Sequence, residues 1–76
     1  MGATTEDLVA MARVRDLCRT GTARAIRVGS HSTLDEVAQV CMVSPSSVSL
    51  WERGLRIPRG QHALDYLAVL EGLMRR

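Results

Sequence analysis

Residues 33–54 read TLDEVAQVCMVSPSSVSLWERG, and this stretch decides the fold. Thr33 and Glu36 form a capping box, because the hydroxyl of Thr33 can accept from the Glu36 amide while the Glu36 carboxylate accepts from the Thr33 amide. Ser44 and Pro45 mark a second helix start, since Ser44 caps and Pro45 occupies the first helical position, where a missing N–H costs nothing. The stretch therefore predicts two short helices joined by a tight turn.

The apolar positions of these two helices indicate how they pack. Small Ala38 lets the helices cross closely, while Val37, Val48 and Trp51 hold their angle. Gly54 is the residue best able to adopt the left-handed conformation that ends a helix, so the second helix is expected to run for about nine residues. Two such helices with a tight turn form the arrangement that presents a helix to the DNA major groove.

Further helices are expected on both sides of this pair. Thr4 or Thr5, followed by acidic residues, caps a helix over residues 5–19, whose apolar residues fall on one stripe. A shorter helix over residues 22–29 and a C-terminal helix over residues 61–75 complete the set. The sequence predicts an all-α, compact five-helix bundle that forms a single domain over residues 1–76.

Composition supports this fold class and points to an anionic partner. The chain has 76 residues, of which 46% are hydrophobic and 24% charged, and its only aromatic residues are Trp51 and Tyr66, which suits packed helices better than a sandwich or barrel. All ten basic residues are arginine, and the formal net charge is +2. Residues 13–59 hold eight of the arginines and only four acidic residues, a balance that favours a polyanion.

Several classes of protein do not fit the sequence. Cys18 and Cys41 stand 23 positions apart, and His31 and His62 are distant from both, so no metal site, redox pair or cofactor is expected. No nucleophile has a recognisable base partner, and a bundle of this size offers little pocket, so neither an enzyme nor a small-molecule ligand is expected. No segment approaches the roughly 18 apolar residues of a membrane helix, so we expect no membrane contact and a cytoplasmic location.

The region 23–70 resembles the Cro and repressor type of helix-turn-helix protein, often called the XRE family. Residues 33–38 are similar to the first helix of the family's motif, and residues 43–54 to its recognition helix, with Trp51-Glu52-Arg53-Gly54 and Pro58 as the most specific element. Two positions depart from the family pattern. Met42 stands where the family usually has glycine, which implies strain of about 1 kcal/mol or a rearranged turn. Leu34 replaces a glutamine that often reaches a phosphate.

The resemblance implies roles for individual residues. It implies that the outward face of the recognition helix reads bases with Ser44, Pro45, Ser46, Ser47, Ser49, Leu50 and Arg53. Phosphate contacts are expected from Arg24, Thr33, Arg56 and Arg59. Arg27 and Glu52 occupy positions that pair across the bundle in related proteins, so they are expected to form a structural ion pair.

The resemblance implies a sequence-specific regulator of transcription that binds double-stranded DNA. Such a protein would resemble a phage Cro-like repressor and would bind a palindromic operator. It would act in a bacterial cytoplasm, associated with the nucleoid. A short recognition helix covers only about 4–5 base pairs, so such modules usually act as symmetric dimers. The C-terminal helix offers a homodimer surface, for which simple packing onto the core is the alternative: Leu67, Leu70, Leu73 and Met74. Two other functions stay open: an antitoxin that also binds a toxin, and a protein-interaction module that has lost DNA binding.

Overall fold

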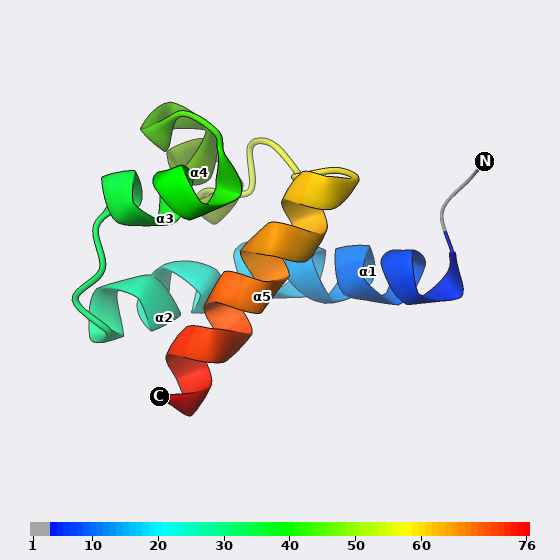
Figure 1. The fold of residues 1–76 in the computed structure, drawn as a ribbon, viewed down its shortest axis with the longest axis horizontal. Coiled ribbons are helices and arrows are strands. Elements are labelled where there is room, and N and C mark those ends of the chain that lie inside the picture. Colours follow the sequence, from blue (N-terminus) through cyan, green and yellow to red (C-terminus); the bar gives the residue numbers. More distant parts are fainter. Residues whose placement is uncertain (1–3) are drawn as a thin grey trace.

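The computed structural model describes residues 4–76, so the first three residues of the predicted domain lie outside the described part. These residues form helices and no strands, which confirms the all-α class. Figure 1 shows the five helices in chain order: α1 (Thr5–Arg19), α2 (Thr22–Gly29), α3 (Leu34–Cys41), α4 (Pro45–Glu52) and α5 (Gln61–Arg75). The bounds of α1, α2 and α5 agree with the predicted ranges.

The helix ends follow the local sequence. Thr4 is the N-cap of α1, and its hydroxyl oxygen accepts from the Asp7 amide at 3.1 Å while the Asp7 carboxylate accepts from the Thr4 amide. At the other end of the chain, Arg75 lies in the last turn of α5, where a positive charge suits the helix dipole.

The core is shared by all five helices. The helix α1 packs against α5 and α2, while α3 packs against both α4 and α5. An ion pair between Arg13 and Glu71, 3.1 Å apart, adds to the contact between α1 and α5. The buried apolar residues of this core are Val14, Cys18, Ala23, Val37, Ala38, Cys41, Val48, Trp51, Tyr66 and Leu70.

Both cysteines pack as small hydrophobic residues. Neither Cys18 nor Cys41 takes part in a disulfide, and burial raises the pKa of each thiol from 9.0 to about 11. Trp51 is also a core residue, with its ring centroid 4.9 Å from that of Tyr66.

The predicted dimer surface is wrong at Leu70. This side chain is fully buried, because the core formed by α1, α2 and α3 covers that side of α5. Leu67 also packs against the core and is half-buried. Of the four residues, Met74 is the one most open to solvent, while Leu73 is half-buried beside α3 in a shallow groove.

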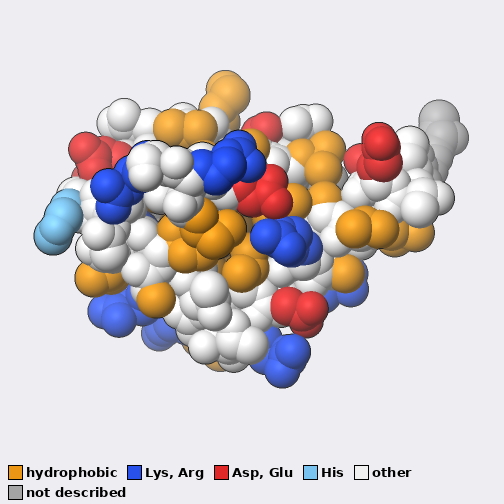
Figure 2. Space-filling model, turned by 90° about the horizontal axis from the view of Figure 1, so that it is seen from below, with side chains coloured by type: hydrophobic (Ala, Val, Ile, Leu, Met, Phe, Trp, Pro, Cys, Tyr) orange, Lys and Arg blue, Asp and Glu red, His pale blue; other side chains and the backbone are white. Residues whose placement is uncertain are grey.

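The first half of α1 extends beyond the rest of the bundle (Figure 1). Leu8 and Val9 are 58% and 62% exposed there. Figure 2 shows hydrophobic side chains on the surface at this end of the molecule. The second half of α1 is the part that contributes Val14 and Cys18 to the core.

Candidate nucleic-acid interface

The first helix of the pair, α3, begins at the predicted capping box. The amide of Thr33 donates to Glu36 Oε1 at 2.8 Å, and the Glu36 amide donates to Thr33 Oγ1 at 3.0 Å. Because the Thr33 oxygen acts as an acceptor here, its hydroxyl proton stays available for an outside acceptor such as a phosphate. Leu34, next in the chain, packs against the core.

The turn after α3 has the geometry that normally calls for glycine. Met42 has φ 59° and ψ 44°, a left-handed conformation, which confirms the expected strain at this position. The Val43 amide donates to the Ala38 carbonyl at 3.0 Å, and the Met42 amide donates to the Gln39 carbonyl at 3.2 Å, the two bonds of a Schellman motif. These bonds satisfy the last carbonyls of α3 and turn the chain into α4.

The second helix, α4, has both of its predicted end signals. Ser44 Oγ accepts from the Ser47 amide at 3.2 Å, and Pro45 follows as the first helical residue. At the other end Gly54 has φ 72°, and the Leu55 amide donates to the Leu50 carbonyl at 3.0 Å. The helix has 8 residues, and Arg53, which was expected within it, is instead its C-cap.

The structure places the predicted base-reading residues on α4 and its two caps. Ser46, Ser49 and Arg53 follow one another at helical spacing, so they share one side of the helix. Exposure divides the predicted set of seven: Ser44, Pro45, Ser46 and Arg53 are exposed, whereas Ser47, Ser49 and Leu50 are half-buried. Ser44 and Ser47 also bond each other through their hydroxyls, 3.1 Å apart, so both take part in capping.

An ion pair fixes the angle of α4 against the bundle. Arg27 Nε lies 2.5 Å from Glu52 Oε2, and Arg27 Nη2 lies 3.1 Å from Glu52 Oε1, so the guanidinium and the carboxylate meet along two parallel hydrogen bonds. Arg27 Nη1 also donates to the Ser32 carbonyl at 2.9 Å. The bond to Glu52 raises the pKa of Arg27 further above its usual value. Both side chains are largely buried, so this pair positions α4 on the side of the helix that faces the bundle.

The predicted phosphate-binding arginines are exposed and lie at two places. Arg56 and Arg59 belong to the loop between α4 and α5, where they line one groove with Ser47 of α4. Arg24 lies on α2 and is not part of this groove. None of these three has a carboxylate within ion-pair distance among residues 4–76. Their charge is therefore available to an outside anion.

His62 is a residue of this groove that the sequence did not single out as a site residue. It is exposed, and its Nδ1 lies 3.2 Å from the Cys41 carbonyl oxygen. Its position in the sequence could have indicated this, because His62 comes three residues after Arg59, in the first turn of α5.

The described residues contain no group of three or more His, Cys, Asp or Glu side chains arranged to hold a metal ion. None of the helices of residues 4–76 is long and apolar enough to cross a membrane.

Two short capped helices, joined by a left-handed turn and with the outer face of the second exposed, define a helix-turn-helix DNA-binding protein. The family model HTH_3, Helix-turn-helix, matches residues 24–72, and the chain belongs to this XRE-type family. The family is a DNA-binding and non-enzymatic domain. The match spans most of α2, all of α3 and α4 and most of α5, and it leaves α1 outside. No curated protein and no solved structure matches the chain.

Proposed function

We propose that this protein is a sequence-specific transcriptional repressor of the Cro-like kind, which occupies a DNA operator by inserting α4 into the major groove. The observation that carries this proposal is the outward side of α4, where exposed Ser46 and Arg53 and half-buried Ser49 follow at helical spacing. The buried Arg27–Glu52 pair holds the opposite side of this helix against the bundle. Capped ends and a fixed angle give such a helix a defined position against base edges.

Few side chains on this helix are suited to direct base readout. Serine can donate to or accept from several bases, Leu50 can contact a thymine methyl, and Arg53 can make two hydrogen bonds to a guanine. The set contains no Asn, Gln or Lys. We therefore expect water-mediated contacts and DNA shape to supply part of the specificity.

Phosphate binding is assigned to three exposed arginines and one exposed hydroxyl around the helix pair. Arg56 and Arg59 flank α4 on the loop side, and Arg24 and the Thr33 hydroxyl lie on other elements of the bundle. Each phosphate neutralised by an arginine releases a condensed counterion, so binding weakens steeply as salt rises.

One copy of α4 covers only part of an operator, so we propose that two copies bind a palindrome. With Leu70 buried in the core, the surface left on α5 for a second copy consists of Met74, Leu73 and the open side of Leu67. The regulator would act in the bacterial cytoplasm, at the nucleoid, where its operator lies.

Selection from a random duplex pool at about physiological salt, followed by sequencing, tests the proposal. An enriched palindrome supports a dimeric reader, and the spacing of its half-sites gives the geometry of the dimer. Binding without enrichment, lost as salt rises, contradicts sequence specificity. Absence of DNA binding at any salt overturns the proposal in favour of a protein-interaction module or a toxin-binding partner.

A further inference from the structure

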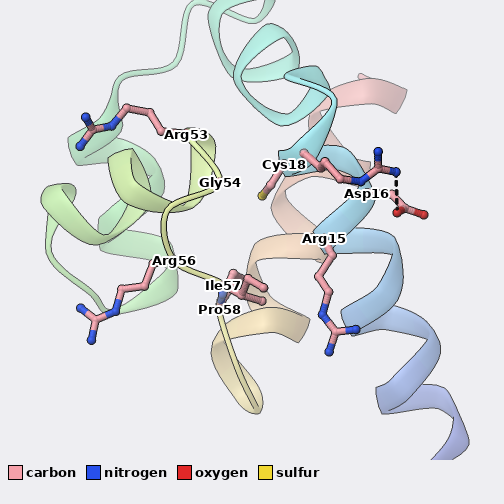
Figure 3. Close-up of a pocket in the computed structure, with 9 residues that line it drawn as sticks. Arg15, Asp16, Cys18, Arg53, Gly54, Arg56, Ile57 and Pro58 are labelled. Carbon is pink, nitrogen blue, oxygen red and sulfur yellow. Dashed lines mark hydrogen bonds and ion pairs between the residues drawn. The ribbon is translucent and has the colours of Figure 1, made fainter.

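A pocket lies between α1 and the segment that follows α4 (Figure 3). It shares Gly54, Arg56, Ile57 and Pro58 with the groove of Arg59 and His62. Its volume is about 440 Å³, within the range of small-molecule sites. One wall is the second half of α1, which lies outside the family match, and the other is the segment 53–58. The lining residues are Arg15, Asp16, Cys18, Arg19, Arg53, Gly54, Arg56, Ile57 and Pro58.

The inner part of the pocket is apolar. Cys18 and Pro58 are buried, and Ile57 is 45% exposed beside them. Figure 3 shows the Cys18 side chain extending from α1 toward the segment at Gly54. Burial raises the pKa of this thiol to about 11, so at neutral pH it is an uncharged, apolar surface and not a nucleophile. A flat hydrocarbon body would displace water from this surface favourably.

The rim of the pocket is cationic. The lining includes four arginines but a single carboxylate, that of Asp16. Arg19 forms an ion pair with this carboxylate at 3.2 Å. Arg15, Arg53 and Arg56 have no carboxylate within ion-pair distance among residues 4–76. In Figure 3, Arg53 and Arg56 start from the wall after α4 and Arg15 starts from α1, so free arginines belong to both walls of the pocket. Their guanidinium groups extend outward, away from Cys18.

We propose that this pocket binds a small anionic ligand with a compact aromatic body, an aromatic carboxylate being the simplest member of the class. The aromatic body of the ligand would lie on Cys18, Ile57 and Pro58. Its carboxylate would accept hydrogen bonds from Arg15 and from an arginine of the other wall. The side chains of these arginines are exposed and free to rotate over the opening of the pocket. Guanidinium groups match carboxylates in shape and charge and also stack on aromatic rings. This proposal differs from the expectation that the protein has no small-molecule ligand. The sequence did not indicate the pocket, because residues 15–19 and 53–58 come together only in the folded protein.

The pocket shares Arg53 and Arg56 with the proposed DNA interface. An anion that holds these side chains competes with DNA for them, so the ligand weakens DNA binding, and DNA weakens ligand binding by the same factor. This coupling rests on the proposed function, whereas binding of the anion does not. The protein would thus release its operator when the anion accumulates.

Titration of ¹⁵N-labelled protein with 2-naphthoate, followed by amide shifts in NMR, tests the pocket. We expect saturable shifts confined to residues 15–19 and 53–58, and about tenfold weaker binding of the neutral analogue 2-naphthalenemethanol. Equal affinity for the two compounds, no saturation by about 10 mM, or shifts centred elsewhere would overturn the proposal.

The variant Arg15→Ala is the sharpest test, because Arg15 is exposed, has no ion-pair partner among the described residues and has no role in the proposed DNA interface. It should weaken 2-naphthoate binding about three- to tenfold. Arg75→Ala, at the far end of α5, is the matched control and should leave binding unchanged. Equal behaviour of the two variants contradicts a role for the rim.

Operator binding measured with and without 2-naphthoate separates this proposal from the proposed function. If the protein binds naphthoate saturably but binds no DNA, the proposed repressor function is refuted and the proposed ligand pocket is supported. DNA binding that is unaffected by saturating naphthoate refutes the coupling. DNA binding without any naphthoate shift refutes the pocket alone.

Discussion

Arg27 of α2 and Glu52 at the end of α4 meet along two parallel hydrogen bonds, with side-chain exposures of 13% and 4%. Twenty-five residues separate them in the sequence, so the pair ties the first helix of the family match to the last turn of the proposed reading helix. Arg27 also holds the Ser32 carbonyl, just before α3 begins. One guanidinium therefore fixes three elements of the helix-turn-helix unit.

Removing one partner of this pair is expected to destabilise the fold. Arg27→Met leaves the Glu52 carboxylate buried without a counter-charge, which should lower the free energy of unfolding by about 3–5 kcal/mol. Urea denaturation of the two proteins measures this difference. The double variant Arg27→Met/Glu52→Leu should regain part of the loss, since no buried charge then remains. A double variant less stable than the single one contradicts this explanation.

Glycine at position 42 is expected to stabilise the protein. Met42→Gly removes the Cβ penalty at φ 59° but adds backbone entropy to the unfolded chain, so the net gain should be about 0.5–1 kcal/mol. The side chain of Met42 is 85% exposed, so little packing is lost. Met42→Ala keeps the Cβ and removes the same exposed surface, and thermal unfolding should show no gain for it. An equal gain for both variants would assign the effect to the side chain.

Arg53→Ala is expected to weaken operator binding by about 1–3 kcal/mol without loss of stability, because the side chain is exposed and forms no ion pair within residues 4–76. A binding titration on the selected operator and on a scrambled duplex measures the loss, which should be greater on the operator. Unchanged operator affinity removes Arg53 from the base-reading set.

Arg56→Ala is expected to act on all DNA sequences alike. Loss of one phosphate contact should flatten the dependence of log affinity on log salt by about one unit of slope. The same titrations repeated at several salt concentrations measure this slope, with Arg75→Ala as the control for lost positive charge. A loss confined to one DNA sequence contradicts a phosphate role.

Stability is expected to fall in alkaline solution. Burial raises the pKa of Cys18 and Cys41 from 9.0 to about 11, so between these values the unfolded chain has lost protons that the folded chain still holds. The free energy of unfolding therefore decreases as pH rises from 9 to 11, and is unaffected by these groups below pH 9. Burial also raises the pKa of Tyr66, which acts in the same direction.

Urea denaturation at a series of pH values measures this effect. The variant Cys18→Ala/Cys41→Ala is less stable at neutral pH because it leaves small cavities, but its stability should decline less steeply above pH 9. An unchanged decline in this variant would assign the alkaline effect to other groups.

The helix boundaries could be predicted because local chemistry sets them. Thr33 with Glu36, and Ser44 with Pro45, satisfy amides that the helix itself leaves free, and the structure shows each of them at a helix start. The strained turn at Met42 was expected from the family resemblance, because the family usually has glycine at this position. A similar left-handed residue, His31 with φ 59°, was not predicted, because no local signal marks it.

The surroundings of α5 could not be predicted in the same way. Helical periodicity shows which residues share a side of a helix, but not which neighbour covers that side. Leu70 is buried because α1 and α2 pack against α5, a contact between opposite ends of the chain. The pocket between α1 and the segment 53–58 escaped prediction for the same reason. The pairing of Arg27 with Glu52, in contrast, came from the family resemblance.

Contact between α1 and α5 also has a consequence for how the protein is made. These are the first and last of the described helices, and α5 supplies Tyr66 and Leu70 to the centre of the core. A nascent chain that has reached only α4 has the complete helix-turn-helix sequence, and α3 and α4 can pack on each other, but it lacks the two α5 residues at the centre of the core. Folding must wait until α5 has left the ribosome, so the protein is expected to acquire its DNA-binding shape in one late step, and a chain shortened before α5 should be degraded.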